Sequence, residues 1–445
     1  MRLLGPALLV LLVAAATAIA QAPPPDEPPL PPGPLSLAQC IEIALQRHPD
    51  IASAEAAVRT ARAQATISSS GLYPQLSLDA SARVTQSLAR PVNIGGGVIQ
   101  VQGQRSTQRD AQATVDWTVF QTGQRDQAHQ AKTQAAASVY GLKDVQRQLV
   151  YSVQSSYYQV LAAREQLKVA MSALANSQRH LDQVQARLDA GQVPASDLLP
   201  IRTEVARAQL TSIQAETDMG TAEAALRALL VVPPTTTLDL GEPLPVRRIG
   251  ADLPELLDLA EENRPDIAEQ KLALQASKLG TKIAEDQAGV TVSAGGGADY
   301  GRHTGTSGYT WNVRVGASYP LFDAGSARAS VTSARAREDQ SLQRLLSTRL
   351  QMNQDVETAY LQMRQSESAV NVAGTAREEA ELSLAAAEAR YQEGLAIIIE
   401  VTDAQLAVVQ AQLAELRARF DYALALAGLS RAVGIPPAAA TGEEQ

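Results

Sequence analysis

Apolar and polar residues follow two different periods along this chain, and the period changes at definite places. From Leu76 to Val84 every second residue is Leu, Ala or Val, with Ser, Asp or Arg between them. A period of two is typical of a β-strand with one apolar and one polar face. The same alternation recurs three times, so we predict four strands, at about 72–88, 109–121, 289–302 and 308–322. A loop rich in glycine, including Gly95 to Gly97, joins the first two.

A seven-residue period replaces the alternation between Gly123 and Asp189. Apolar residues recur seven apart, proline is absent, and a second series three residues later is rich in Ala and Ser. Sustained heptads predict long helices packed lengthwise, and small residues allow close approach. At about 1.5 Å per residue, this helix would be roughly 100 Å long. We expect it to end at Gly191 and a second helix to return from about Ser196.

The second half of the chain repeats the first. Ile43 to Ile51, with its Pro-Asp pair, returns at 259–267, and Trp117 to Gly123 returns at 319–325. A nearly constant offset of this kind indicates an internal duplication. Each half is predicted to be helix, β-hairpin, very long helix, turn and returning helix. The predicted repeats cover 36–233 and 252–434, with a linker over 234–251.

The ends of the chain carry different signals. Arg2, an apolar run and Ala18-Ile-Ala20 predict a cleaved secretory signal peptide over residues 1–20. The proline-rich segment 21–35 predicts a disordered spacer, and 435–445 a disordered tail. No later stretch approaches the about 18 apolar residues of a membrane-spanning helix.

Composition and charge exclude several classes of protein. A formal charge of −9 without any basic block argues against nucleic acid as a partner. The four histidines lack metal-ligand spacing, and the glycine triplets lack the Lys-Ser/Thr of a phosphate-binding loop. No nucleophile, base and orienting group occur together, so we predict no enzyme, cofactor or metal site.

Four strands with one apolar face cannot close a membrane barrel, because single-chain barrels need at least about 8. Open strand edges are not tolerated in lipid, so several copies must pool their strands. Three copies would give about twelve strands, enough for a lumen. The apolar side chains would then face lipid, and the interfacial aromatic belt would comprise Tyr73, Trp117, Tyr309, Trp311 and Tyr319.

The chain resembles the TolC-family outer-membrane factors. The resemblance rests on the helix-Pro-Asp opening at 37–51, Leu72-Tyr-Pro-Gln-Leu76, Pro320-Leu-Phe-Asp-Ala-Gly325, and Arg390-Tyr-Gln-Glu-Gly394 followed by Glu400-Val-Thr-Asp-Ala404. It implies a mainly α-helical homotrimer with a 12-stranded β-barrel in the outer membrane and an α-helical barrel in the periplasm. It also implies a periplasmic adaptor protein and an inner-membrane transporter as partners.

The same resemblance implies roles for residues at the two hairpin tips. Glu400 and Asp403 match acidic rings that line the periplasmic entrance, although Glu and Asp are also favourable at any helix start. The family's basic latch residue falls at Ala396, so a looser or an apolar closure through Ile397 to Ile399 is the alternative. The tips would dock the adaptor, or serve only as turns, through Arg187, Leu188, Gly191, Arg390, Tyr391 and Gly394.

The predicted function is therefore a passive exit duct for efflux across the outer membrane. A duct for type I protein secretion would use the same tube, and the sequence does not separate the two. A soluble periplasmic coiled-coil scaffold is a third reading, which the four alternating strands oppose.

Overall fold

The structure is a computed structural model that describes residues 33–95, 97–101, 103, 105–241, 252–303 and 306–435. The predicted signal peptide and most of the predicted spacer lie outside the described residues. Residues 242–251 of the predicted linker and 436–445 of the predicted tail also lie outside them.

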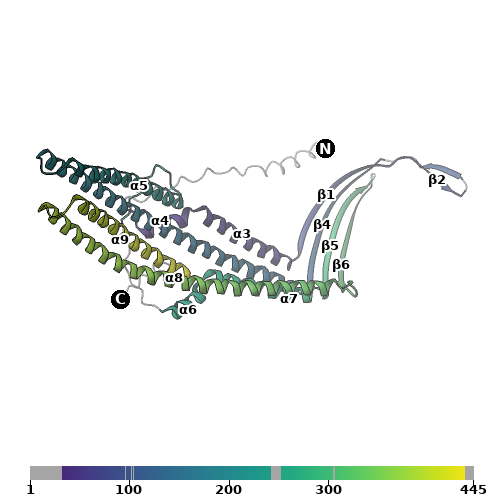
Figure 1. The fold of residues 1–445 in the computed structure, drawn as a ribbon. Coiled ribbons are helices and arrows are strands. Elements are labelled where there is room, and N and C mark those ends of the chain that lie inside the picture. The colour runs from purple at the N-terminus through teal and green to yellow at the C-terminus, as the bar shows by residue number, and fades with distance from the viewer. Residues whose placement is uncertain are drawn as a thin grey trace.

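The described chain has the predicted mainly α-helical architecture, repeated twice (Figure 1). The first half consists of α2 (Leu37–Arg47), α3 (Pro49–Ser70), β1 (Gln75–Gln86), β4 (Arg105–Gln121), α4 (Gln124–Asp189), a 3₁₀ turn (Ala195–Asp197) and α5 (Leu198–Leu230). The second half consists of α6 (Leu253–Asn263), α7 (Pro265–Asp286), β5 (Thr291–His303), β6 (Thr306–Ser318), α8 (Ser326–Gln392) and α9 (Ile398–Val433).

Local signals explain where the opening helices begin. The Ser36 hydroxyl accepts a hydrogen bond from the Gln39 backbone N–H at 3.3 Å, and the Ser36 N–H donates to the Gln39 side chain at 2.9 Å. This reciprocal pair is a capping box, which satisfies two donors at the helix start. Pro49 and Pro265 then open α3 and α7, because proline fits the first helical position but not a helix interior.

The four long strands form one antiparallel sheet in the order β1-β4-β5-β6, which leaves one end of the helical bundle and curves away from it (Figure 1). Both outer strands, β1 and β6, have an edge with no partner within this described sheet. The prediction of a glycine-rich loop between the first two long strands is wrong in part. Its residues form a two-stranded extension, β2 (Arg90–Ile94) with β3 (Gly97–Val101), beyond the sheet. Gly95, with φ of +57°, lies at the turn between them.

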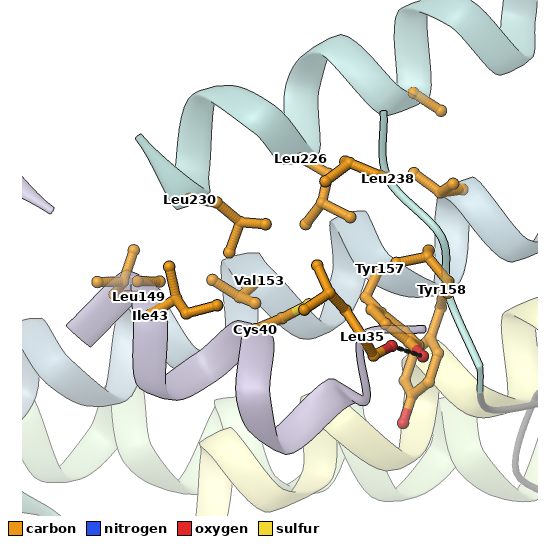
Figure 2. Close-up of a cluster of buried hydrophobic side chains, with 14 of the residues drawn as sticks. Leu35, Cys40, Ile43, Leu149, Val153, Tyr157, Tyr158, Leu226, Leu230 and Leu238 are labelled. Carbon is orange, nitrogen blue, oxygen red and sulfur yellow. Dashed lines mark hydrogen bonds between the residues drawn. The ribbon is translucent and has the colours of Figure 1, made fainter. Parts of the chain in front are cut away.

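The first half is held by a core between α2, α4 and α5 (Figure 2). Cys40, Val153 and Leu226 are fully buried there, and the Tyr157 hydroxyl donates a hydrogen bond to the Leu35 carbonyl at 3.1 Å. Leu35 also forms a parallel β-bridge with Leu240. The predicted disorder of the spacer is therefore wrong at its last residue, because Leu35 buries an apolar side chain beside the end of the first repeat.

The second half has its own core, and a buried charge joins its helices. Arg264, whose side chain is 4% exposed, lies between α6 and α7. Its guanidinium contacts Asp266 at 2.6 and 3.0 Å, Asp355 of α8 at 3.0 Å and the Ala432 carbonyl of α9 at 3.3 Å. One side chain thus holds three helices together. Among the described residues, none of the helices has both the length and the apolar content needed to cross a membrane.

Candidate functional site

The register of the sheet collects the apolar side chains on one face. Residues that pair directly across antiparallel strands point to the same side. Leu76 pairs with Val115, Val115 with Gly296, and Gly296 with Val313. A neighbouring row is Leu78, Ala113, Ala298 and Trp311. The apolar face is therefore continuous over all four strands, and its large side chains, such as Leu78 at 81% exposed, are uncovered.

A β-bulge alters this face near the helices. The alternation predicts that Val119 continues the apolar series of β4. The register shifts between Thr118 and Phe120, so that Phe120 pairs with Val292 instead. A bulge inserts one extra residue and bends its strand. Phe120 therefore takes the place on this face that the sequence pattern assigns to Val119.

The opposite face is polar and is cross-linked by side chains. The hydroxyls of Ser77 and Thr114 are 2.5 Å apart. Arg314 of β6 forms an ion pair with Asp116 of β4 across the intervening strand β5. Gly295 is the β5 residue between them, and a Cβ there would lie 3.1 Å from the Asp116 carboxylate and 3.2 Å from Arg314 Nε. The glycine therefore leaves room for the bridge.

The five predicted belt residues fall into two groups along the strands. Tyr73, Trp117 and Tyr319 lie at the end of the sheet that joins the helices, where the Trp117 indole donates to the Leu72 carbonyl at 3.2 Å. Tyr309 and Trp311 lie toward the other end. There Tyr309 packs on Tyr300 with ring centroids 4.7 Å apart. Sequence reasoning missed Tyr300 as a neighbour of this second group, because the glycines before it hide the alternation of β5.

The predicted hairpin tips have identical hydrogen bonding in the two halves. Gly191 has φ of +73°, its N–H donates to the Leu188 carbonyl at 2.8 Å, and the next N–H donates to Arg187 at 2.9 Å. Gly394 has φ of +76°, with the matching bonds to Tyr391 and Arg390 at 3.1 and 2.8 Å. These are Schellman motifs, in which glycine accepts the left-handed backbone without strain. The duplication thus extends to single hydrogen bonds.

The two tips also contact each other. The Arg187 guanidinium lies 5.2 Å from the centre of the Tyr391 ring, and His180 packs on the same ring at 6.5 Å. Beneath them lies an apolar cluster of Val184, Leu198, Ile201 and Ile398. The first hairpin (α4 and α5) is thereby packed against the second (α8 and α9).

The two predicted entrance acids have different surroundings. Glu400 forms an ion pair with Arg390 at 3.2 Å, so its charge is compensated within the tip. Asp403 is exposed, and it makes no ion pair with any residue that the structure describes. Its neighbour is Glu204 of α5, a residue that sequence reasoning missed. Burial raises the pKa of the Glu204 carboxyl, Arg207 opposes that shift, and Asp403 adds to it.

A cavity of about 380 Å³ lies between the two hairpins, above their tips. Its lining includes His180, Glu204, Arg207 and Glu388, together with apolar residues of α9. Burial lowers the pKa of the His180 imidazole, against the effects of Gln183 and Glu388. Within the part of the chain that the structure describes, no group of three or more His, Cys, Asp or Glu side chains is arranged to hold a metal ion.

The sequence profile of the outer membrane efflux protein family matches residues 40–231 and 256–435, and so matches both halves of the chain. The chain belongs to the outer membrane efflux protein family. The pyoverdine export outer membrane protein OpmQ of Pseudomonas putida is 30% identical to it over 413 residues, which are 89% of this chain and 85% of that protein.

Solved channels share the fold of this outer membrane efflux protein. The outer-membrane channel OprN is 22% identical, with a TM-score of 0.77 over 90% of each chain. The open state of the Neisseria gonorrhoeae MtrE outer membrane channel is also 22% identical, with a TM-score of 0.77 over 90% of this chain and 89% of that one. Family members are trimeric outer-membrane ducts that work with adaptors and inner-membrane pumps. The predicted outer-membrane location and role as an efflux duct are therefore confirmed.

Proposed function

We propose that three copies of this chain pool their strands into one 12-stranded barrel and their helices into one α-helical barrel. The observation that carries the proposal is the sheet itself, which has one continuous apolar face and two outer edges, on β1 and β6, that pair with no other strand the structure describes. Pairing β1 of one copy with β6 of the next satisfies both edges, as a lipid environment requires. The polar face then lines an aqueous lumen, and the duct is passive.

The two aromatic groups set the proposed position of the barrel in the membrane. Tyr309 lies in β6, and Tyr319 lies ten residues later, directly after the end of that strand. At about 3.3 Å per residue this is roughly 33 Å, or about 25 Å in height for a strand tilted by about 40°. Outer-membrane barrels have an apolar band of about 25 Å between their aromatic girdles. The end bearing Tyr73 and Trp117 would then face the periplasm, where the helices lie.

The hairpin tips are the proposed docking points for the periplasmic adaptor, which in turn contacts the inner-membrane transporter. Both tips are the parts of the helical bundle farthest from the sheet (Figure 1). Their Schellman turns hold Arg187 and Arg390 at fixed positions, and exposed Leu395 offers an apolar contact at the second tip. We assign the supply of energy to the transporter.

We propose that Asp403, rather than Glu400, supplies the uncompensated charge of the periplasmic entrance. Three copies would place three such carboxylates in one ring, and rings of carboxylates favour cations. Ala396 stands where a basic latch would be, and its neighbours Ile397 and Ile399 are 61% and 50% exposed. We therefore propose an apolar closure of the tips in place of a charged latch.

Planar-bilayer conductance of the purified full-length trimer tests the entrance. D403N should lower the preference for cations, whereas the double variant R390Q/E400Q should change it less, because the ion pair that it removes carries no net charge. R390Q is the matched control, since it releases the Glu400 charge and should raise cation preference. Equal selectivity in all three variants would remove these residues from the conduction path.

The cargo that we propose is a small compound, because the relative at 30% identity is a pyoverdine export protein. Another relative, CzcC of Cupriavidus metallidurans, is a cobalt-zinc-cadmium resistance protein and is 25% identical over 324 residues. Deletion of the gene should therefore increase sensitivity to some members of a panel of drugs, dyes and metals. Loss of secreted proteins with unchanged sensitivity would instead identify a protein-secretion duct.

A further inference from the structure

The apolar face of the sheet changes character just beyond its outer aromatic group. The last aromatic row is Ala80, Ala111, Tyr300 and Tyr309. Two residues farther along β4, on the same face, lies Arg109, which pairs with Ala82 on one side and with Arg302 on the other. Arg105 lies four residues beyond Arg109 along β4, on the same face, and pairs with Gln86. The face that carries Leu and Val near the helices thus carries arginine at its far end.

Among the described residues, Arg105 and Arg109 have no carboxylate beside them on their own face. The acidic residues at this height, Asp110 and Asp79, occupy the alternate positions and belong to the polar face, where Ser81 donates to Asp110 at 3.4 Å. Arg105 and Arg109 are both exposed, and neither forms an ion pair with another described residue. At this height the acidic residues therefore lie on the polar face, whereas Arg105 and Arg109 lie on the apolar face without a compensating carboxylate among the described residues.

We infer that Arg109, with Arg105 behind it, binds the phosphate groups of lipid headgroups in the outer leaflet. The inference rests on the proposed function, because it requires the apolar face to lie in the membrane. Arg109 is two residues, or about 7 Å along the strand, beyond the aromatic row, which is the depth of the headgroup layer. A guanidinium makes strong, bidentate hydrogen bonds to phosphate. A free phosphate ion would lack the adjacent acyl chains that Tyr300 and Tyr309 contact.

The chain offers a matched control at the same height. Arg83 pairs with Gln108, one position from Arg109, and so lies on the polar face. It has the same charge and is also exposed. If the arginines act only through the net charge of the barrel, R83Q and R109Q should have equal effects. If Arg109 binds headgroups directly, only R109Q should matter.

The experiment is native mass spectrometry of the full-length trimer in a non-ionic detergent, titrated with bisphosphorylated lipid A and with its dephosphorylated form. Each basic residue near a charged membrane surface contributes a factor of about five in binding. We expect R109Q to weaken binding of the phosphorylated lipid about fivefold and R105Q/R109Q up to about 25-fold. R105Q alone should have a smaller effect than R109Q, because it lies farther out, and R83Q should change binding less than twofold.

Equal losses in R83Q and R109Q, or equal binding of the two lipid forms by the unaltered trimer, would overturn the inference. The same spectra report the oligomeric state, so failure of the underlying function is seen separately. A chain that purifies as a monomer without detergent would refute the barrel itself, whereas an intact trimer with no preference for phosphate would refute only the role of the arginines.

Discussion

Arg264 is the residue whose removal should damage the helical part of this protein most. R264A removes a guanidinium that is 4% exposed and leaves Asp266 and Asp355 without their partner. Breaking a buried ion pair from one side costs about 3–5 kcal/mol, since a charge remains buried and unpaired. Asp266 is 22% exposed and Asp355 30% exposed, so water reaches both in part. We therefore expect a loss near the lower limit, about 3 kcal/mol.

The assay is denaturant unfolding of the detergent-solubilised trimer at fixed concentration, followed by helical circular dichroism. The control is H48A. His48 occupies the corresponding position before Pro49 in the first half, but its contacts are local: it accepts from the Asp50 N–H at 3.3 Å and lies 3.6 Å from the Asp50 carboxylate. Loss of a helix cap of this kind costs about 1 kcal/mol. If R264A and H48A lose the same stability, the guanidinium does not join α7, α8 and α9 as described.

Other predictions follow from single contacts. V231G should stabilise the helices by about 1 kcal/mol in the same assay, because Val231 has φ of 54° where the second half has Gly434. G295V should prevent a heat-modifiable trimer on gels, since its side chain would strike the bridge between Arg314 and Asp116. Arg264 lowers the pKa of Asp266 despite burial, so this carboxylate stabilises the fold above its unfolded pKa of about 3.9 and stops doing so as pH falls through its lower folded value. An acid melting curve with no loss below pH of about 3.9 would contradict that assignment.

The helical architecture could be predicted from sequence because the heptad period extends over two whole helices. α4 and α8 each contain more than sixty residues, so one polar residue in the seven-residue apolar series, such as Gln146 between Val139 and Val153 of α4, does not hide the pattern. The four long strands could be predicted because apolar and polar residues alternate over most of their length. The β2–β3 extension could not, because three consecutive glycines at its turn carry no alternation.

The contacts of the candidate site residues could not be predicted from the sequence. Glycine at 191 and 394 is a local signal, and both turns have the geometry that glycine favours. The proximity of Glu204 to Asp403 is not local, since the two residues lie on different hairpins almost two hundred positions apart. The pairing of Glu400 with Arg390 likewise depends on how α8 and α9 meet. The roles of these residues in gating and docking stay predictions.

The outer edges of β1 and β6, which pair with no other described strand, have a genetic consequence. A subunit with a damaged β1 or β6 would keep one intact outer edge, so it could still assemble with unaltered subunits. Its damaged edge could not pair with the neighbouring subunit, so the barrel would stay open at that position. Such an allele should act dominantly when expressed beside the unaltered gene, whereas an allele that removes the sheet altogether should be recessive.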